Sequence, residues 1–458
     1  MMQHSETIAA IATATGRAGI SCVRISGPAA YAVAAAVFTP ANPRRSLAAA
    51  KGYTAFYGSF SRGGRRMDEA VALCFRAPKS YTGEDVVELS VHGGEAITKE
   101  LLAACYDAGA APAAAGEFTR RAFLNGRISL TQAEAVMEMI EATGEAGARA
   151  AAAAMQGALY RKISGVAGQL TALAGHIAAY TDYPEEDVEE LSDAALSATL
   201  AAARGELEEL LASYESGSIL RRGVRTAIVG SPNVGKSTLL NLMSGFEKAI
   251  VTPIAGTTRD VVEQDISLAG TTLLLADTAG LRDTQDPVEA EGIRRSQQKL
   301  EEANLILAVF DASRALTGDD LALAQRCRGR LAIAICNKTD LPRAADIAAI
   351  APCFHAVVEL SAKEEGFSPR LRQAILGLIE TSHIDPDAAL LANERQRAAA
   401  VRAQQALAEA QTAQQTGFAL DAVSVCVDDA LDALYELTGE RASDAVIDDV
   451  FSRFCVGK

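Results

Sequence analysis

Between about residue 224 and residue 380, short apolar runs alternate with longer stretches of helical pattern. The apolar runs are "RTAIVG", "TTLLLADTAG", "LILAVFDAS", "LAIAICNKTD" and "FHAVVELSAK". Strands that alternate with helices are typical of a mostly parallel sheet with helices on its faces. The pattern therefore predicts a doubly wound, Ras-like α/β domain over residues 219–382.

The pattern changes on both sides of this segment. Residues 1–120 contain the strand-like runs "ISCVRISG", "AVALCFRAP" and "DVVELSVHGG" and a helical stretch near "EAITKELLAACYDAGA", which predict an α+β domain. Residues 121–218 and 383–458 are helical and rich in Ala. The simplest interpretation inserts the α/β domain into one helical domain whose two parts pack together. Two independent helical domains are the alternative.

Length, charge and cysteine content narrow the class of protein. A chain of 458 residues is too long for one core and suggests about two to four domains. Acidic residues outnumber basic ones, 58 to 43, which disfavours a stand-alone nucleic-acid-binding protein. The eight cysteines are scattered, and no apolar run approaches the roughly 20 residues of a membrane span. We expect a soluble, cytoplasmic protein with reduced thiols.

Two basic clusters occur in spite of the net charge of −15. One is "RGGRR" at Arg62–Arg66, and Arg120, Arg121 and Arg127 form the other. For either cluster alone, solvated surface charge is the favoured interpretation.

The segment "GSPNVGKST" carries the strongest chemical signal. It lies between a strand-like and a helix-like run and matches the P-loop pattern at Gly230, Gly235, Lys236 and Ser237. Glycines let the backbone curl so that its N–H groups face phosphates, the lysine reaches the β- and γ-phosphates, and the serine hydroxyl binds Mg²⁺. A nucleotide site is therefore expected here.

Three later motifs follow in the order of a GTPase. "DTAG" ends a strand, where Asp277 can hold Mg²⁺ through water and Gly280 can donate its N–H to the γ-phosphate. "NKTD" places the Asp340 carboxylate to accept from the N1–H and amine of guanine, a donor pair that adenine lacks. "SAK", residues 361–363, would close over the base. GTP is therefore favoured over ATP.

The residue that orients the attacking water is not fixed by these motifs. In Ras-like proteins a Gln follows the second motif, but Leu281 stands at that position here. Glu289 is one candidate, and Glu291 and Asp283 have the same chemistry. Solvated loop charge is the alternative for all three.

A further set of segments extends along the whole chain: "TIAAIATATGRAGISCVRISGP", "SYTGEDVVELSVHGG", "GEFTRRAFLNGRISLTQAEAV", "DYPEED", "GSPNVGKSTLLN", "VTPIAGTTRD", "DTAGLR" and "FCVGK". In these segments and their order, the chain resembles the MnmE (TrmE) family of tRNA-modifying GTPases. That resemblance is far more specific than the GTPase motifs alone.

The resemblance implies a potassium-dependent G domain. Thr258 in the switch loop "TPIAGTTRD" would complete the Mg²⁺ coordination begun by Ser237, and Glu289 would be the catalytic residue that orients water. The implied K⁺ ligands are Asn233, Thr252, Ile254 and Thr257. The implied GTP-binding residues are Gly230, Asn233, Val234, Gly235, Lys236, Ser237, Thr238, Thr252, Pro253, Ile254, Ala255, Gly256, Thr257, Thr258, Asp277, Thr278, Ala279, Gly280, Asn337, Lys338, Asp340, Ser361, Ala362 and Lys363.

The resemblance also implies a folate site. The N-terminal domain is similar to folate-binding domains of the aminomethyltransferase type and would take part in forming a homodimer. The implied contacts to 5,10-methylene- or 5-formyl-tetrahydrofolate are Arg24, Glu88, Arg127 and Lys458. The family usually has Lys where this chain has Arg127, so the charge is kept but the donor geometry changes.

The ending "FCVGK" raises three possibilities for Cys455. Prenylation is excluded because Gly457 is not aliphatic and Lys458 is an atypical last residue. A buried filler remains possible, which is the favoured interpretation for the cysteines in apolar runs, Cys22, Cys74, Cys105 and Cys336. The resemblance favours a catalytic Cys455 and leaves open whether it is a nucleophile or an acid/base.

The implied reaction adds a carboxymethylaminomethyl or aminomethyl group to C5 of the wobble uridine of certain tRNAs. The partner would be an FAD-containing protein of the MnmG type, in a heterotetramer that contacts tRNA mainly through that partner. A GTP-dependent assembly switch is the main alternative, and a folate-dependent methyltransferase acting alone is a weaker one. No membrane partner is expected.

Overall fold

The structure is a computed structural model of the whole chain. It describes residues 6–14, 16–142, 144–182, 192–214, 217, 223–244, 263–268, 271–276, 303–363, 368–379, 385, 387–416 and 420–458. The chain forms two compact units. One unit contains residues 1–137, 163–196 and 405–458, and the other contains residues 138–162 and 197–404.

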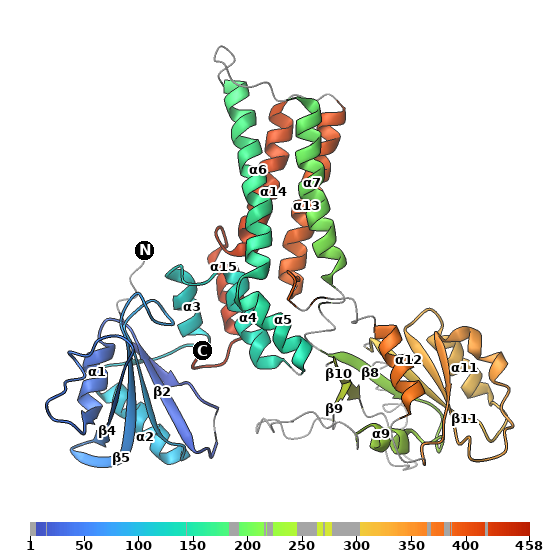
Figure 1. The fold of residues 1–458 in the computed structure, drawn as a ribbon, viewed down its shortest axis with the longest axis horizontal. Coiled ribbons are helices and arrows are strands. Elements are labelled where there is room, and N and C mark those ends of the chain that lie inside the picture. Colours follow the sequence, from blue (N-terminus) through green and yellow to red (C-terminus); the bar gives the residue numbers. More distant parts are fainter. Residues whose placement is uncertain are drawn as a thin grey trace. The chain divides into compact units, whose positions relative to one another are not determined.

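The first unit begins with a seven-stranded sheet (Figure 1). Its strands are β1 (Ile8–Ile11), β2 (Ile20–Ser26), β3 (Phe38–Pro40), β4 (Thr54–Arg62), β5 (Arg65–Phe75), β6 (Val86–His92) and β7 (Ala111–Pro112). Their spatial order is β3-β4-β5-β6-β2-β1-β7. Helices α1 (Ala30–Val37) and α2 (Glu95–Asp107) pack with the buried side chains of the sheet in one core. The expected α+β architecture is present.

Alternation along β2 and β6 decides which side chains stay accessible. Val23 and Leu89 are fully buried in the core beneath α1 and α2. Because successive side chains in a strand point to opposite faces, Arg24 and Glu88 lie on the other face. The antiparallel register pairs Arg24 directly with Glu88. This pairing places two of the predicted folate contacts side by side.

Helices complete the first unit. They include α3 (Glu117–Leu124), the start of α4 (Leu130–Glu141), most of α6 (Ala158–Asp182), α14 (Leu420–Thr438) and α15 (Asp444–Ser452). Leu130 of α4 and Phe451 of α15 belong to one buried cluster. Ser443 begins α15 as its N-cap, where its hydroxyl accepts from the N–H of Val446.

A six-stranded sheet forms the centre of the second unit. Its strands are β8 (Val224–Val229), β9 (Glu263–Leu268), β10 (Thr271–Ala276), β11 (Leu305–Asp311), β12 (Ala332–Asn337) and β13 (Ala356–Glu359), in the spatial order β13-β12-β11-β8-β10-β9. All neighbours are parallel except β9 and β10. This is the sheet that the apolar runs predict.

Helices cover both faces of this sheet. Side chains of α9 (Lys236–Ser244) and α12 (Pro369–Ile379) belong to one buried cluster, with Leu307 of β11. Side chains of α11 (Gly318–Cys327) belong to a second cluster, with Ile306 of the same strand. Odd and even positions of one buried strand thus meet opposite helix layers, which defines a doubly wound fold.

The second unit also contains helices from both ends of the inserted segment. They are α5 (Glu145–Met155), most of α7 (Asp193–Ala212) and the first half of α13 (Glu394–Gln415). The Tyr214 hydroxyl donates to Glu394 at 3.1 Å, and the Gln404 amide donates to Glu208 at 3.3 Å. Within the first unit, the Thr171 and Tyr435 hydroxyls are 3.0 Å apart. Helices before and after the α/β segment therefore contact one another, as the insertion hypothesis predicts.

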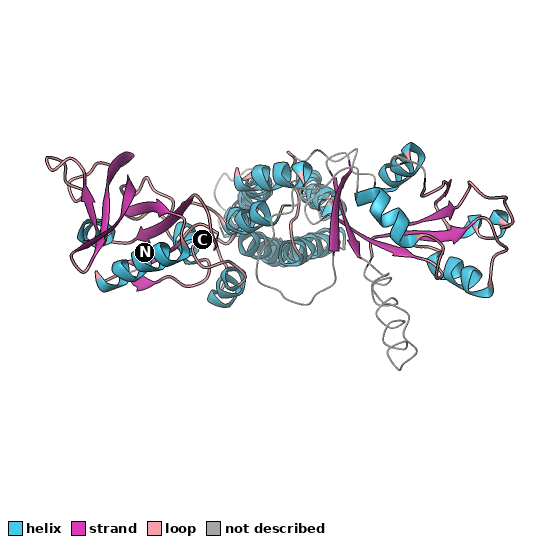
Figure 2. Cartoon of the chain, turned by 90° about the horizontal axis from the view of Figure 1, so that it is seen from below, coloured by secondary structure: helices cyan, strands magenta, loops and turns pink. Residues whose placement is uncertain are grey.

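Strands occur only within residues 8–112 and 224–359 of the described chain, and helices make up most of the rest (Figure 2). None of the helices in that described part is both long enough and apolar enough to cross a lipid bilayer. The fold class predicted from the sequence is confirmed.

Candidate nucleotide site and a second candidate site on the N-terminal sheet

Two glycines of the P-loop occupy positions where a side chain could not fit. Gly230 follows β8 with φ 155°, and a Cβ built on it would lie 2.3 Å from the carbonyl oxygen of Val309. Gly235 precedes α9 with φ 101°, and a Cβ there would lie 2.2 Å from Nδ2 of Asn337. These positive φ values and close approaches explain why the loop needs glycine at both ends.

The lysine and hydroxyl groups of the P-loop lie at the start of α9. The Lys236 ammonium donates to the carbonyl oxygens of Gly230 and Ser231 at 2.8 and 2.9 Å. Ser237 and Thr238 are exposed in the first turn of the helix. Free N–H groups and the helix dipole favour an anion at such a terminus. The loop therefore has the donors that a polyphosphate requires.

Asn233 lies in the middle of the P-loop and has a φ of 61°. Asn tolerates this left-handed conformation better than most residues. Its side chain is exposed, so its amide oxygen is accessible to a ligand.

Asn337 joins three of the predicted nucleotide-binding segments. Its buried side chain donates to the carbonyl oxygen of Val234 at 2.7 Å and accepts from the N–H of Ala362 at 2.9 Å. One amide therefore connects the P-loop, the end of β12 and the segment after β13. Because all three follow the carboxyl ends of parallel strands, they meet at one edge of the sheet.

The surroundings of Asp340 favour its ionised form, which accepts hydrogen bonds. The Ser361 hydroxyl donates to it at 2.9 Å, and the Lys363 ammonium lies 3.5 Å from its other oxygen. The Ser361 hydrogen bond, with the nearby Lys363 charge, lowers the pKa of Asp340 below its usual value. An ionised carboxylate is an acceptor for the two donors that guanine presents.

Two acids outside the four motifs also contact this site. Asp311, at the end of β11, accepts from the Lys338 ammonium at 2.6 Å. Asp320, in α11, accepts from the Ser231 hydroxyl at 2.7 Å. Sequence motifs do not identify either residue, although "TGDD" at residues 317–320 has the spacing of a helix capping box.

Several predicted site residues lie outside the described residues. They are the switch-loop residues Thr252, Pro253, Ile254, Ala255, Gly256, Thr257 and Thr258, the second-motif residues Asp277, Thr278, Ala279 and Gly280, and the acids Asp283, Glu289 and Glu291. Their roles stay predictions.

A second group of predicted residues meets on the open face of the N-terminal sheet. Arg24 Nε donates to Glu88 Oε1 at 2.8 Å, and the Arg24 side chain is 17% exposed. The Arg24 guanidinium lies 5.2 Å from the ring centre of Tyr81 and 5.5 Å from that of Phe118. Two aromatic rings and a carboxylate therefore hold one half-buried cation in place.

The rings beside Arg24 are themselves connected to α3. The Tyr81 hydroxyl lies 2.9 Å from the hydroxyl of Thr119. Arg127 is exposed and lies close to the segment after Tyr81, because a Cβ built on Gly83 would be 3.4 Å from Cγ of Arg127. Tyr81 and Phe118 were not predicted from the sequence, because cation–π contacts depend on tertiary positions that no local pattern reveals.

The chain's last residues contact α3, which also carries Phe118, and the end of β1. The N–H of Phe118 donates to the carbonyl oxygen of Lys458 at 3.1 Å, and Val456 forms an isolated antiparallel bridge with Ala115. Gly457 has φ 102°, and a Cβ on it would lie 2.1 Å from the carbonyl oxygen of Ile11. Glycine is therefore required for this close approach. The tail lies between the end of β1 and the start of α3.

The thiols differ in accessibility. Cys455 is exposed, whereas Cys74, Cys105 and Cys336 are buried, as expected for fillers. Burial raises the pKa of Cys105 to about 12. Cys22 is half-buried beside Glu88, and burial, with the Glu88 charge, raises its pKa to about 11. Cys455, in the tail itself, is thus the exposed thiol, and Cys426 is half-buried.

One part of the surface-charge interpretation is wrong. Arg121 is 2% exposed and its guanidinium lies 2.7 Å from Glu117 and 3.1 Å from Glu84. It also donates to the carbonyl oxygen of Glu6 at 2.9 Å. A buried guanidinium needs such partners for its donors, so Arg121 is a structural residue rather than surface charge.

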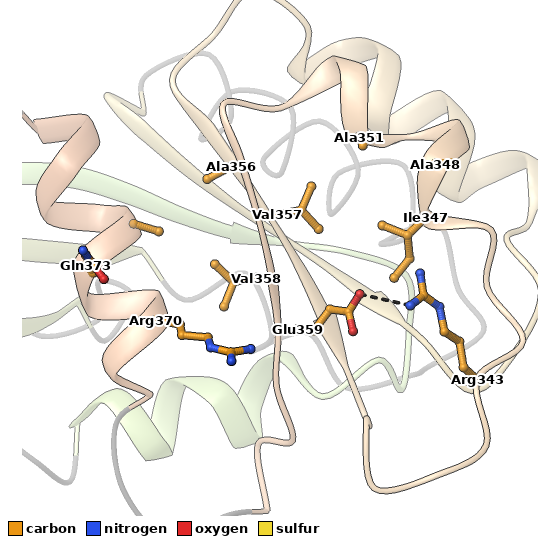
Figure 3. Close-up of a pocket in the computed structure, with 11 residues that line it drawn as sticks. Arg343, Ile347, Ala348, Ala351, Ala356, Val357, Val358, Glu359, Arg370 and Gln373 are labelled. Carbon is orange, nitrogen blue, oxygen red and sulfur yellow. Dashed lines mark hydrogen bonds and ion pairs between the residues drawn. The ribbon is translucent and has the colours of Figure 1, made fainter.

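Two hollows in the part of the chain that the structure describes lie away from both sites. One hollow of about 670 Å³ lies beside edge strand β13 and α12, where Arg343 and Glu359 form an ion pair of 3.2 Å (Figure 3). Another, of about 910 Å³, is lined by residues including His92 and Lys99 near the start of α2. Neither lining includes a predicted site residue.

Two family models match this chain. Residues 7–127 match the N-terminus of the GTP-binding protein TrmE, and residues 130–455 match the MnmE helical domain. The chain belongs to the MnmE family. The membership agrees with the P-loop fold and with the tail on the N-terminal sheet.

Curated relatives cover the whole length. The chain is 43% identical to a protein of Synechococcus sp. strain JA-3-3Ab, with 99% of this chain and 98% of the relative covered. It is 42% identical to one from Symbiobacterium thermophilum, with 99% of each covered. It is 41% identical to one from Lactococcus lactis subsp. cremoris strain MG1363, with 100% of each covered. Each relative is named tRNA modification GTPase MnmE.

A solved structure of Era from Aquifex aeolicus is 27% identical and covers 40% of this chain and 66% of its own, with a TM-score of 0.26. The fold assignment rests on the strand order of the six-stranded sheet and on the helix layers on its two faces.

Proposed function

We propose that this chain hydrolyses GTP and takes part in modifying C5 of the wobble uridine of certain tRNAs. The observation that carries the proposal is that a chain of the MnmE family combines a P-loop nucleotide site with an Arg24–Glu88 pair on its N-terminal sheet and an exposed thiol near the C-terminus, on Cys455, whose carbonyl oxygen accepts from the N–H of Gly116. The added group would be carboxymethylaminomethyl or aminomethyl, with a tetrahydrofolate derivative as source of the one-carbon unit.

We propose the domain bounds 1–120, 121–218, 219–382 and 383–458 for these activities. The first would bind folate and form the homodimer, and the third would bind GTP. We also expect the protein in the cytoplasm, because GTP and tRNA are found there.

In the nucleotide site, the chain's own groups divide the work. The N–H groups of the P-loop and the Lys236 ammonium would hold the phosphates, and Asp340 would read guanine. Because Lys236 already faces the carbonyl oxygens of the loop, phosphate binding would exchange those contacts for stronger ones to an anion. Glu289 would orient the attacking water.

The hydroxyl of Ser237 fits Mg²⁺, which prefers oxygen ligands, and Thr258 would be the second protein ligand. Asn233 presents an accessible amide oxygen that suits K⁺, with Thr252, Ile254 and Thr257 as the other proposed ligands. When bound, K⁺ would supply positive charge as an arginine finger does elsewhere. G domains would pair across their nucleotide faces when GTP and K⁺ are present.

The potassium proposal has a direct test. The initial rate of phosphate release from GTP should be higher in KCl than in NaCl at equal ionic strength. Asn233→Ala should reduce the difference between the two salts. Equal rates in both salts would remove the K⁺ assignment and leave the GTPase assignment intact.

On the N-terminal sheet, the donor set fits a folate. Arg24 offers a guanidinium near two aromatic rings, and Glu88 accepts donors, which suits the pteridine ring and the glutamate carboxylates of that ligand. Arg127 and Lys458 would add cations. A bound folate would supply an activated one-carbon unit, and the exposed Cys455 thiol would act beside it.

The net charge of −15 argues for a partner that carries most of the tRNA contact. We propose an FAD-containing protein of the MnmG type, in a heterotetramer with the homodimer. Modification by the isolated chain would contradict this division.

Mass spectrometry of tRNA nucleosides tests the proposed function most directly. A strain without the gene should lose the modified wobble uridine, and the wild-type gene should restore it. Cys455→Ser should restore GTP hydrolysis but not the nucleoside, whereas Cys426→Ser provides a matched control thiol that should restore both. An unchanged nucleoside profile in the deletion strain would favour the assembly-switch alternative.

A further inference from the structure

The second residue of the P-loop directs its side chain to α11. The Ser231 hydroxyl donates to Oδ1 of Asp320 at 2.7 Å. Asp320 is the third residue of α11, and its side chain is 1% exposed. A buried carboxylate oxygen that accepts from a loop hydroxyl restricts that loop, because an acceptor left unsatisfied in the interior is costly.

The two carboxylate oxygens of Asp320 have different hydrogen-bond partners. Oδ2 accepts from the N–H of Thr317 at 3.0 Å, from the Thr317 hydroxyl at 2.9 Å and from Arg314 at 2.9 Å. Together with the Thr317 hydroxyl that accepts from the Asp320 N–H, these contacts form the capping box of α11. Oδ1 instead reaches Ser231. Helix capping and loop contact therefore occur on separate atoms of one side chain.

Ser231 also contacts Lys236 through its backbone. Its carbonyl oxygen accepts from the Lys236 ammonium at 2.9 Å. Pro232 follows and favours an extended conformation for Ser231. Because Asp320 holds the Ser231 side chain, the Ser231 carbonyl has one defined orientation. The start of the P-loop is oriented with it.

The same β11–α11 segment reaches the base-reading end of the site. Asp311, where β11 ends, accepts from the hydroxyl of Ser313 at 2.6 Å and from the Lys338 ammonium at 2.6 Å. Residues 311–320 therefore contact the P-loop at one end and the "NKTD" segment at the other. Asp320 therefore belongs to a segment that contacts both loops that would hold the nucleotide.

We propose that Asp320 is a positioning residue for GTP and GDP binding: through Ser231 it fixes the P-loop in the conformation that receives the phosphates. Asp320 itself would touch neither nucleotide nor Mg²⁺. The inference rests on the proposed GTP binding. Burial raises the pKa of Asp320, but hydrogen bonds from Ser231 and Thr317 outweigh burial and lower it below its usual value. The carboxylate stays charged at neutral pH as the role requires.

Two pairs of variants, each with and without one hydroxyl, separate positioning from helix capping. Ser231→Thr keeps the hydroxyl and Ser231→Val removes it, with the same branching at Cβ. Thr317→Ser keeps the capping hydroxyl and Thr317→Val removes it. Each full-length variant is measured for the affinity and dissociation rate of GDP carrying a fluorescent group on the ribose, for KM and kcat with GTP, and for thermal stability.

We expect Ser231→Val to bind the GDP probe about tenfold more weakly than Ser231→Thr, through faster dissociation, with kcat within about twofold. Thr317→Val should lower thermal stability relative to Thr317→Ser while leaving GDP affinity within about twofold. Equal GDP affinities in Ser231→Thr and Ser231→Val would overturn the inference. So would an affinity loss in Thr317→Val as large as that in Ser231→Val, because Asp320 would then act only as a cap.

A double-mutant cycle with Asp320→Asn checks that the effect passes through the pair. The amide has one acceptor and cannot serve both Ser231 and the Thr317 N–H, so Asp320→Asn should weaken GDP binding by itself. Adding Ser231→Val should then cause less than half of its effect in the wild-type chain. Full additivity would overturn the inference. A wild-type chain that binds no GDP probe would instead overturn the proposed function, and the inference with it.

Discussion

The nucleotide site and the N-terminal site are assembled in different ways. In the G domain, short contiguous motifs at the ends of parallel strands supply backbone donors, and Asn337 alone ties three of them together. On the N-terminal sheet, single residues from β2, β6, the segment before β6, α3 and the tail meet around Arg24. The first type of site can be located from local sequence motifs. The second type forms only when the strands of the sheet have paired in their native register.

The largest effect that tests this comparison is expected for Lys236→Ala. The lysine is the main cation of the P-loop, so its loss should lower kcat for GTP hydrolysis by about 10²–10³-fold. Lys162→Ala is a suitable control, because that lysine pairs with Glu206 at 2.6 Å in the helical part of the second unit. Phosphate release within threefold of wild type would contradict the role of Lys236. Folate binding should be unchanged in both variants.

The converse experiment uses Arg24→Ala. Removing a half-buried guanidinium leaves Glu88 without its partner, so affinity for 5-formyl-tetrahydrofolate should fall by about 10²-fold in calorimetry. Arg24→Lys should recover only part of it, because an ammonium does not stack flat on rings as a guanidinium does. Arg62→Ala, which removes an ion pair with Glu100, is the control. A parallel loss of GTPase activity in Arg24→Ala would break the separation of the two sites.

A smaller effect is expected within the nucleotide site for Asp340→Asn. The amide keeps the size but replaces one acceptor by a donor, which should weaken GTP binding by about 10–100-fold. The same donor suits the C2 carbonyl of xanthine, so the variant should prefer XTP over GTP in competition binding. Asp346→Asn, at an exposed acid outside the site, should leave both affinities unchanged. Retained GTP preference in Asp340→Asn would show that the guanine is read elsewhere.

The smallest effect concerns the ion pair of the exposed His92 with the half-buried Asp68, which lies outside both sites. The Asp68 hydrogen bond raises the pKa of His92 above its ordinary 6.5, and although burial raises the pKa of Asp68, its bonds from His92 outweigh burial and lower it below 3.8. The histidine part of this stabilisation is present below pH 6.5 and is lost as pH rises through the raised pKa. The aspartate part is present above pH 3.8 and is lost as pH falls through the lowered pKa.

NMR titration of the His92 ring provides the measurement. Asp68→Asn should return the pKa of His92 toward 6.5, and Glu69→Gln should change it less, because Glu69 contributes a weaker charge effect. Both GTP hydrolysis and folate binding should be unaffected at pH 7. An unshifted His92 pKa in wild type would show that the ion pair does not persist in solution.

Sequence patterns predicted the G domain almost completely. The strands β8, β10, β11, β12 and β13 coincide with the five apolar runs. Nearly every side chain of β8, β11 and β12 is buried, and a strand buried on both faces leaves a continuous hydrophobic signal. The edge strand β13 is half-exposed, and Val358 is its buried residue. The antiparallel edge strand β9 left no such signal. In the N-terminal domain β2, β5 and β6 were predicted, but β1, β3, β4 and β7 were not, because short or half-exposed strands have weak periodicity.

The candidate sites divide in the same way. The P-loop and "NKTD" could be located because glycine, lysine and carboxylate at fixed spacing have a local chemical meaning. Arg24, Glu88 and Lys458 were named through the family resemblance, whereas their companions Tyr81, Phe118 and Asp320 were not. Stacking on Arg24 and the Ser231–Asp320 bond both join residues far apart in the chain, so no local pattern could reveal them.

The tail has a consequence for the order of events during synthesis. A ribosome makes the N-terminal sheet first and Gly457 and Lys458 after the G domain. The partner of the Phe118 N–H, Lys458, and the residue that packs against Ile11, Gly457, are therefore synthesised more than 300 positions later. These contacts of the first domain form only when the nucleotide-binding domain has already left the ribosome, so a chain that stops early would lack the contacts of Gly457 and Lys458.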